Sequence, residues 1–203
     1  MITLYHSPRT RSSRFIFLLE ELGAPYRIHS IARSEAGVGR DPANPHPHGK
    51  VPAISDDGVA VFESSAIALY LTDRFPEAGI GPVVGDPKRG AYLTWLAYYC
   101  GVMEPAWMMK FMKVELPPTM PGWPPADQVM EFVNRTLEAG PYLLGERFSA
   151  ADILAGTTFA MFMGGGMVEK TPLLEGYVQR VVGRPAYARA QAREAEAEAA
   201  ATT

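Results

Sequence analysis

A glycine-rich segment near the middle of the chain separates two parts that carry different secondary-structure signals. Residues 77–85 contain three glycines and show no apolar periodicity, which is typical of a linker. Residues 1–76 mix strand and helix patterns, whereas residues 86–203 show helix patterns alone. Because 203 residues are enough for two small domains, we expect an α/β domain over 1–76 and an all-helical domain over 86–203.

The first part is expected to follow the order β-α-β-α-β-β-α. An Asp-Gly turn predicts that the last two strands form a hairpin, which makes the sheet mixed rather than fully parallel. The second helix of this order is at most one turn, because residues 33–49 contain three prolines and three glycines. The predicted elements are strands 2–6, 26–31, 51–55 and 59–62, and helices 12–22 and 64–75.

Capping residues mark helix starts in the second part. The first of these helices should follow Asp86-Pro87 and bend at Pro105. Ser149 and Asp152 have the spacing of a capping box, so losing either should cost about 0.5–2 kcal/mol of stability and leave the chemistry intact. The expected helices cover 86–114 and 126–139 and begin again near 149, 171 and 184, with a proline-rich loop over 115–125 and a fraying Ala/Glu-rich tail over 195–203.

Composition restricts the classes of function. A net charge of −3 shows none of the basic surplus that is usual in nucleic-acid binders. No apolar run approaches the ~18 residues of a membrane span, and the chain starts without a basic-then-apolar leader. The single Cys100 excludes an internal disulfide, a CxxC redox pair and a multi-cysteine zinc site. We expect a cytoplasmic protein that binds neither nucleic acid nor membrane.

Six motifs spread over almost the whole chain resemble one known family. They are Leu4-Tyr5-His6-Ser7-Pro8, Leu18-Leu19-Glu20-Glu21-Leu22-Gly23, Gly49-Lys50-Val51-Pro52-Ala53-Ile54, Glu63-Ser64-Ser65-Ala66-Ile67-Ala68-Leu69-Tyr70-Leu71, Phe148-Ser149-Ala150-Ala151-Asp152-Ile153 and Arg184-Pro185-Ala186-Tyr187. In this order and spacing they are similar to the cytosolic glutathione transferases, in particular to bacterial-type members. The resemblance implies a thioredoxin-like N-terminal domain, a helical-bundle C-terminal domain, a homodimer, and glutathione as co-substrate.

The resemblance also implies a glutathione site on the first domain. Val51-Pro52 is expected to be a cis peptide that presents backbone groups to the cysteine of glutathione, the alternative being an ordinary trans proline in an edge strand. Glu63-Ser64, at a helix start, should bind the γ-glutamyl ammonium and carboxylate, although a plain helix cap would use the same atoms. Lys50 should pair with the glycine carboxylate, unless it is only a solvated loop charge.

One binding position departs from the family pattern. His46 stands where the family commonly has Asn, and it is expected to lie at the glycine end of the ligand. His46 and His48 could instead suggest a metal site. Two histidines without a Cys or carboxylate partner make a poor one, so no metal is expected.

Thiol activation is expected from the residues that follow the first strand. The thiol of free glutathione is mostly neutral at pH 7, so the thiolate must be stabilised by a helix N-terminus and a donated hydrogen bond. Family members use Tyr, Ser or Cys here, and this chain offers Thr10 first and Ser12 second, with Arg11 adding positive potential. The alternative is that these hydroxyls only cap the helix or are solvated.

Aromatic and methionine side chains on the long helix suggest a pocket for a hydrophobic substrate, because such side chains adapt to varied apolar ligands. The predicted lining residues are Tyr99, Met103, Trp107 and Phe111. The alternative is that this stripe is core or dimer interface.

We therefore predict a glutathione transferase with a role in detoxification. It should bind reduced glutathione, activate the thiol and conjugate it to a small hydrophobic electrophile. Two alternatives stay open: a glutathione-dependent isomerase, lyase or dehalogenase on the same scaffold, and a non-catalytic member that binds apolar ligands or proteins. The retention of residues for both ends of glutathione favours an enzyme.

Overall fold

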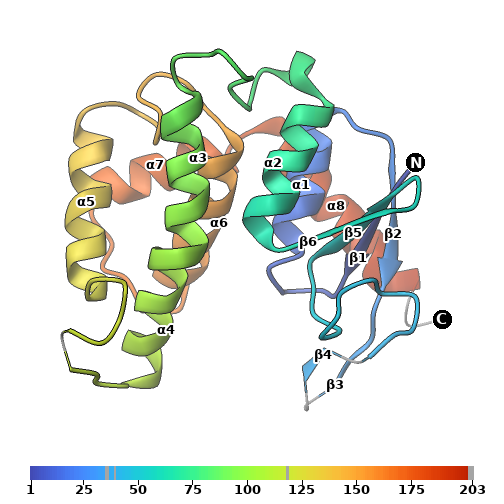
Figure 1. Ribbon diagram of the computed structural model, residues 1–203, viewed down its shortest axis with the longest axis horizontal. Coiled ribbons are helices and arrows are strands. Elements are labelled where there is room, and N and C mark those ends of the chain that lie inside the picture. The colour runs from blue at the N-terminus through green and yellow to red at the C-terminus, as the bar shows by residue number, and fades with distance from the viewer. Residues whose placement is uncertain (35–36, 39, 118, 201–203) are drawn as a thin grey trace. The chain divides into compact units, whose positions relative to one another are not determined.

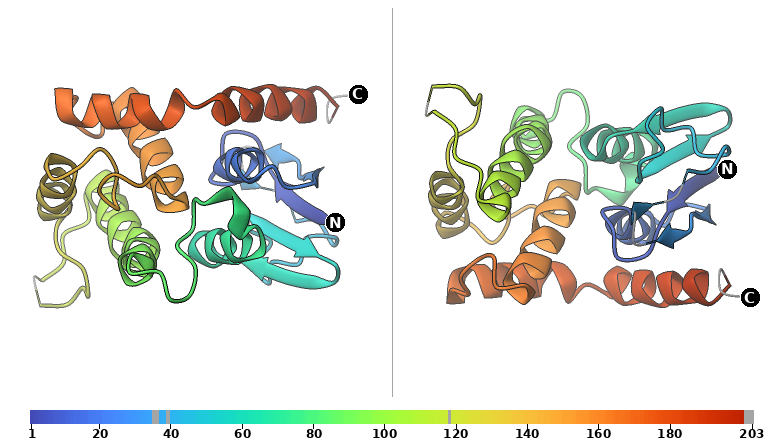
Figure 2. Two further views of the ribbon diagram at one scale, coloured as in Figure 1. Left: turned by 90° about the horizontal axis from the view of Figure 1, so that it is seen from above. Right: turned by 90° about the horizontal axis from the view of Figure 1, so that it is seen from below.

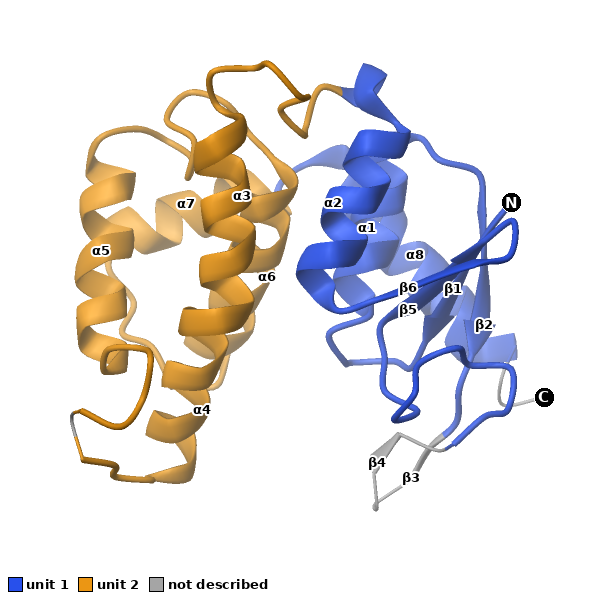
Figure 3. Cartoon of the chain, in the orientation of Figure 1, with its two compact units in different colours: residues 1–78, 183–203 blue, residues 79–182 orange. Residues whose placement is uncertain are grey.

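The computed structural model describes residues 1–34, 37–38, 40–117 and 119–200 (Figure 1). The chain divides into two compact units, shown in Figure 3: unit 1 is Met1–Ala78 with Gly183–Thr203, and unit 2 is Gly79–Val182. The C-terminal helix therefore groups with the N-terminal strands and helices. This differs from the predicted helical domain 86–203, because that helix packs along the first helix of unit 1.

Unit 1 is built on a four-stranded mixed sheet with the strand order β2-β1-β5-β6. β1 (Ile2–His6) pairs in parallel with β2 (Tyr26–Ser30) and antiparallel with β5 (Ala53–Asp56), and β5 forms a hairpin with β6 (Val59–Phe62). Both turn residues of the hairpin have positive φ, which an Asp-Gly turn of this length requires. The mixed sheet expected from the sequence is confirmed.

The connection between β2 and β5 differs from the predicted order. β3 (Arg33–Ser34) pairs antiparallel with β4 (Gly37–Val38), and residues 40–52 form turns and loop. Among the described residues of this connection there is no helix, so the second helix of β-α-β-α-β-β-α is not found there. Closely spaced prolines explain this, because each removes a backbone donor. Residues 35, 36 and 39 lie outside the described residues.

Three helices complete unit 1: α1 (Ser13–Leu22), α2 (Ser64–Arg74) and α8 (Pro185–Ala200). α1 and α2 lie on one side of the sheet, and Figure 2 shows α8 running beside α1 in both views. α1 ends as predicted at Gly23, whose φ of 62° places it in the left-handed region that favours glycine at this position.

α8 packs on α1 through both apolar and charged side chains. Arg184 donates to the Glu21 carboxylate, and the Arg189 guanidinium donates to Glu20 Oε2 at 3.0 Å. The structure continues α8 to Ala200, which differs from the predicted fraying of the tail. Buried Ala186 and Ala190 and the contact of Tyr187 with Phe17 hold the first half of α8, and ion pairs hold the rest. Residues 201–203 lie outside the described residues.

Unit 2 is helical. Its elements are α3 (Arg89–Tyr98), a π-helical turn (Tyr99–Met103), α4 (Glu104–Met112), α5 (Ala126–Glu138), α6 (Ala150–Gly164) and α7 (Pro172–Val182). The π-helical turn interrupts the long helix just before Pro105, which has no N–H to donate, so the predicted irregularity occurs at the expected place. No helix among the described residues is both long and apolar enough to cross a membrane.

The predicted capping box opens α6, the most buried helix of unit 2. Asp152 Oδ2 accepts bonds from the Ser149 N–H (2.8 Å) and hydroxyl (3.1 Å). Asp152 Oδ1 accepts bonds from the Leu143 N–H (2.9 Å) and the Tyr177 hydroxyl (3.1 Å). Burial nevertheless raises the pKa of this carboxyl to about 6. Asp152 thus joins α6, α7 and the preceding loop.

Candidate active site

The sheet of unit 1 brings three connections to one edge. Tyr5 pairs with Ala53 and Ala53 pairs with Phe62 across β1, β5 and β6. The loop after β1, the residues before β5 and the residues after β6 therefore leave the sheet at the same edge. These connections carry the predicted binding residues 10–12, 50–52 and 63–64.

The connection before β5 contains the predicted cis proline. The Val51–Pro52 peptide bond is cis, in agreement with the resemblance. Lys50 is exposed, and its carbonyl accepts a bond from Asn44 Nδ2 at 3.0 Å. This bond ties the loop that precedes Lys50 to the start of β5. It therefore fixes the backbone from which the Lys50 ammonium extends.

The connection after β6 has an unusual backbone. Glu63 has a φ of 71°, in the left-handed region, which is strained for a residue with a side chain. Its side chain is 70% exposed, while Ser64, the first residue of α2, is buried. An exposed carboxylate therefore stands beside the positive N-terminal end of α2.

His46 lies next to this carboxylate. Its Nε2 is 3.8 Å from Glu63 Oε1, and its Nδ1 accepts a bond from the His48 N–H at 3.0 Å. The ring is almost fully buried, and its centroid lies 5.0 Å from that of the tilted Phe62 ring. His46 thus helps to order the loop beside Glu63. In the described part of the chain, no three His, Cys, Asp or Glu side chains are grouped as metal ligands.

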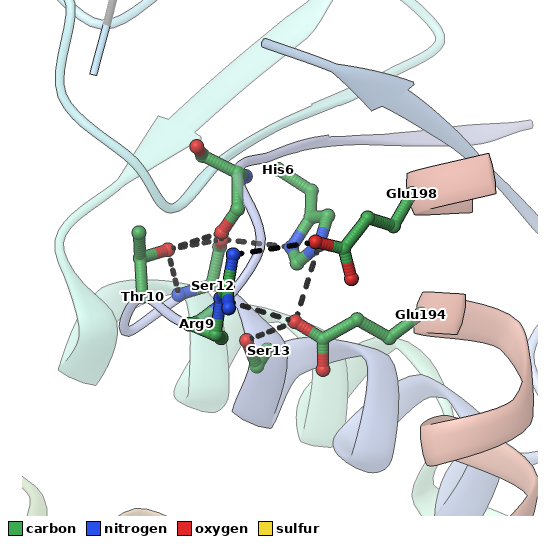
Figure 4. A network of polar contacts seen from close by, with 8 residues as sticks. His6, Arg9, Thr10, Ser12, Ser13, Glu194 and Glu198 are labelled. Carbon is green, nitrogen blue, oxygen red and sulfur yellow. Dashed lines mark hydrogen bonds and ion pairs between the residues drawn. The ribbon is translucent and has the colours of Figure 1, made fainter. Parts of the chain in front are cut away.

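The two predicted activating hydroxyls have different environments (Figure 4). Ser12 is fully buried, and its Oγ lies 2.9 Å from His6 Nδ1 and 2.7 Å from Thr10 Oγ1. The same Ser12 oxygen also accepts a bond from the Ser7 N–H at 3.1 Å. Thr10 is only half-buried. Of the two residues, Thr10 is the more exposed, and Arg11 is exposed beside it. The Thr10 hydroxyl donates to the Ser7 carbonyl at 2.7 Å.

The structure adds residues to this network that the sequence analysis did not predict. His6 is fully buried in β1, and its Nε2 lies 3.5 Å from Glu194 Oε1 of α8. Glu194 Oε1 also accepts bonds from the Ser13 hydroxyl (2.6 Å) and the Arg9 N–H (3.1 Å). Glu198, one turn further along α8, pairs with the Arg9 guanidinium at 3.4 Å. His6 belongs to the first motif of the sequence analysis. Its neighbours in the sequence gave no sign that it would lie beside a carboxylate near the C-terminus.

The predicted pocket residues of unit 2 occupy different environments. Tyr99 and Met103 are enclosed in the core, and the Tyr99 hydroxyl lies 2.7 Å from Glu104 and 2.8 Å from Thr158. Phe111 is exposed, whereas Trp107 lines a cavity of about 350 Å³ within unit 2.

Comparisons with known proteins agree with this architecture. Two family models match the chain: the N-terminal domain of glutathione S-transferase over residues 10–74 and its C-terminal domain over 124–185. The chain is 31% identical over 167 residues to the disulfide-bond oxidoreductase YfcG of Escherichia coli strain K12, covering 75% of this chain and 76% of that protein. The chain belongs to the glutathione transferase family.

Solved structures of glutathione transferases share the fold. The glutathione transferase of Methylococcus capsulatus has a TM-score of 0.77 and 28% identity, covering 96% of this chain and 99% of that chain. A sphingomonad glutathione S-transferase complexed with glutathione has a TM-score of 0.75 and 25% identity, covering 95% and 98%. The predicted family and fold class, a thioredoxin-like part with a helical part, are confirmed.

Proposed function

We propose that this glutathione transferase binds reduced glutathione at the sheet edge of unit 1 and conjugates its thiol to a small hydrophobic electrophile. The observation that carries the proposal is the meeting, at one edge of the sheet, of the Thr10 hydroxyl, the cis Val51–Pro52 peptide and the exposed Glu63 carboxylate. Each of these groups suits a different part of the same tripeptide.

Each end of glutathione has a charge that a group at this site can bind. The γ-glutamyl end carries an ammonium that the Glu63 carboxylate can bind, and a carboxylate that suits the first N–H groups of α2, starting at Ser64. The backbone of Val51 can pair with the cysteine residue as an added strand would. The exposed Lys50 ammonium can pair with the glycine carboxylate, with His46 ordering the loop that precedes Lys50.

Thr10 is the proposed partner of the sulfur. A free thiol with a pKa near 8.5 is mostly protonated at pH 7, so a hydrogen bond to the thiolate and the positive end of α1 both favour ionisation. Ser12 is fully buried, so its hydroxyl holds the Thr10 hydroxyl in position through their 2.7 Å contact. The thiolate then forms an S–C bond to the electrophilic carbon, which bound glutathione holds close.

The electrophile is proposed to meet apolar side chains of unit 2. Trp107 and Phe111 are the stronger candidates, because the first lines a cavity and the second is exposed. Tyr99 and Met103, which were predicted as lining residues, are instead enclosed in the core and do not line this cavity. A homodimer and a role in detoxification complete the proposal, on the resemblance to the family alone.

Glutathione binding and conjugation test the proposal. Calorimetric titration with reduced glutathione should give saturable binding, and mass spectrometry should detect the conjugate formed with an activated aryl chloride. Glu63→Gln should weaken glutathione binding, because it removes the charge that faces the ammonium. Glu77→Gln, a matched change at an exposed position, should not. Absence of glutathione binding would reject the proposal.

A second candidate function is the reduction of small disulfides, favoured by the identity to the oxidoreductase YfcG. The one cysteine, Cys100, lies in unit 2, so the nucleophile would be glutathione itself. Its thiolate would attack a disulfide and release one thiolate, and a second glutathione would resolve the mixed disulfide to glutathione disulfide. Turnover of hydroxyethyl disulfide, measured against turnover of the aryl chloride, decides between the two reactions.

A further inference from the structure

A carboxylate, an imidazole and two hydroxyls form a continuous chain from α8 to the N-terminus of α1 (Figure 4). Glu194 Oε1 lies 3.5 Å from His6 Nε2, and His6 Nδ1 lies 2.9 Å from Ser12 Oγ. Ser12 Oγ in turn lies 2.7 Å from Thr10 Oγ1. Carboxylate, imidazole and hydroxyl follow in the order seen in enzymes where a histidine takes a proton from a hydroxyl.

We propose that this chain of groups is a proton relay that carries the thiol proton of bound glutathione to His6. The proposal rests on the glutathione-binding function above. It gives the proton that leaves the sulfur a destination inside the protein rather than in the solvent. His6 and Glu194 act through Thr10 and Ser12 without touching glutathione, so both are positioning residues.

The hydrogen-bonding capacity of these groups allows the relay. His6 Nε2 faces the Glu194 carboxylate, which only accepts, so Nε2 carries the ring hydrogen and Nδ1 accepts the Ser12 hydroxyl proton. Ser12 Oγ accepts the Ser7 N–H at 3.1 Å. The Thr10 hydroxyl lies 2.7 Å from Ser12 Oγ and 2.7 Å from the Ser7 carbonyl, so its one hydrogen is donated to the carbonyl at rest and to Ser12 during the relay. The Ser12 hydroxyl lies 3.2 Å from the same carbonyl and 2.9 Å from His6 Nδ1. Thr10 Oγ1 accepts the Ser12 N–H at 3.2 Å and keeps one lone pair for an arriving proton.

Three protons each move by one hydrogen bond in this step. The S–H bond breaks as its proton bonds to Thr10 Oγ1, the proton of Thr10 passes to Ser12 Oγ, and the proton of Ser12 passes to His6 Nδ1. The products are a thiolate and an imidazolium, and both hydroxyls are restored. No oxidant or reductant takes part. The imidazolium faces Glu194, as a charged ring in a buried site requires.

An unsatisfied buried atom supports this assignment independently. His6 Nε2 has no hydrogen-bond partner among the described residues, because the contact to Glu194 at 3.5 Å is too weak to count as one. Protonation of the ring turns this contact into a buried ion pair. Before glutathione binds, burial lowers the pKa of His6, and the smaller effects of Glu194 and Glu198 raise it, so the resting ring is neutral.

The charges around His6 come from α8 and from the loop after β1. Glu198 is paired with the Arg9 guanidinium at 3.4 Å, which leaves Glu194 as the carboxylate closest to the ring. On the other side, β2 places the uncharged Ser30 opposite His6 in the strand register. A proton on His6 is therefore stabilised chiefly by Glu194.

Proton counting tests the relay on the full chain. Glutathione binding at pH 7 is measured by calorimetry in buffers of different ionisation enthalpy, while ultraviolet absorption reports the thiolate. The relay predicts a thiolate with well under one proton released per site, because His6 keeps the proton. ¹⁵N NMR should show the His6 ring change from the Nε2–H form to imidazolium with glutathione. S-methylglutathione, which has no thiol proton, should leave the ring neutral.

Matched variants separate the relay from a structural role. Glu194→Gln keeps the shape of the side chain and removes its charge, so it should lower the thiolate fraction at pH 7 about tenfold, equivalent to one pKa unit. Glu196→Gln makes the same change on the same helix, where Glu196 pairs with Arg193 at 2.8 Å, and should have no effect. His6→Gln should form less thiolate and release to the buffer the proton of any thiolate that forms.

The outcomes are distinct. A thiolate with full proton release and a neutral His6 would overturn the relay alone and leave the glutathione site intact. Equal thiolate fractions in Glu194→Gln and Glu196→Gln would also overturn it. If neither glutathione nor S-methylglutathione binds, the proposed function fails first and the relay fails with it. Should His6→Gln not fold, the NMR measurement and the Glu194→Gln variant still decide.

Discussion

A carboxylate lies at the N-terminus of α6 and another at that of α1, and the two networks differ in whether they are complete. At α6, Asp152 accepts four bonds from fixed groups of unit 2. At α1, Glu194 reaches in from α8, a buried imidazole nitrogen beside it has no hydrogen bond, and the network ends at the half-exposed Thr10. A complete network stabilises a helix, whereas an incomplete one leaves an atom that a ligand can use.

The largest expected effect comes from breaking the complete network. Asp152→Ala removes the acceptor of two buried groups, the Leu143 N–H and the Tyr177 hydroxyl, besides the capping bond. The free energy of unfolding should fall by about 3 kcal/mol, more than a cap alone contributes. Denaturant titration measures this loss, and turnover per folded molecule should be retained. Asp127→Ala, at an exposed acid paired with Lys110, should cost under about 1 kcal/mol. An Asp152→Ala protein as stable as the wild type would contradict the structural role.

The matching change in the incomplete network should affect turnover instead. Thr10→Ala removes the exposed end of the chain of hydroxyls, so kcat should fall about 100-fold, as for loss of one preorganised donor. Stability and glutathione affinity should change little, because the rest of the site is intact. Thr10→Ser restores a hydroxyl at the same position and should recover most of the rate. Steady-state kinetics with varied glutathione measures both constants, and an unchanged kcat would remove Thr10 from the site.

The two networks also differ in how far the sequence could predict them. Ser149 and Asp152 are three residues apart, so their bond depends only on a local helix start, and the capping box was predicted in full. Thr10 was ranked before Ser12 from the sequence, but the difference in burial between them depends on packing that no local pattern contains. Glu194 could not be predicted at all. Its role depends on the docking of α8 along α1, which no local pattern around Glu194 indicates.

The fold shows the same dependence on distance along the chain. The four main strands and most helices lie close to their predicted positions, because alternation, apolar stripes and caps are local patterns. The grouping of residues 183–200 with unit 1 was missed, since pairs such as Arg189 and Glu20 are far apart in the sequence. The sequence alone also did not show that the three connections meet at one edge of the sheet, because that depends on how β1, β5 and β6 pair.

The pH dependence of Asp152 offers a smaller and sharper test of the complete network. Burial raises the pKa of this carboxyl to about 6 in the folded protein, above its ordinary value, so its contribution to stability is present at low pH and lost as the pH rises through 6. Asp152→Asn cannot titrate. The stability difference between wild type and Asp152→Asn should therefore be about 1 kcal/mol larger at pH 5 than at pH 7. Paired denaturant titrations at both pH values measure it, and a difference of opposite sign would mean that the four donors outweigh burial.

The smallest expected effect is the loss of one donor from the incomplete network. The Ser13 hydroxyl donates to Glu194 at 2.6 Å, but it is only half-buried, and water can replace it once removed. Ser13→Ala should therefore lower the free energy of unfolding by about 1 kcal/mol or less. Ser149→Ala removes a fully buried hydroxyl that faces Asp152, so it should cost up to about 2 kcal/mol. Denaturant titration of both variants compares the two helix starts directly. If Ser13→Ala were as costly as Asp152→Ala, the network at α1 would be as complete as that at α6, and its ligand-binding role would lose its physical basis.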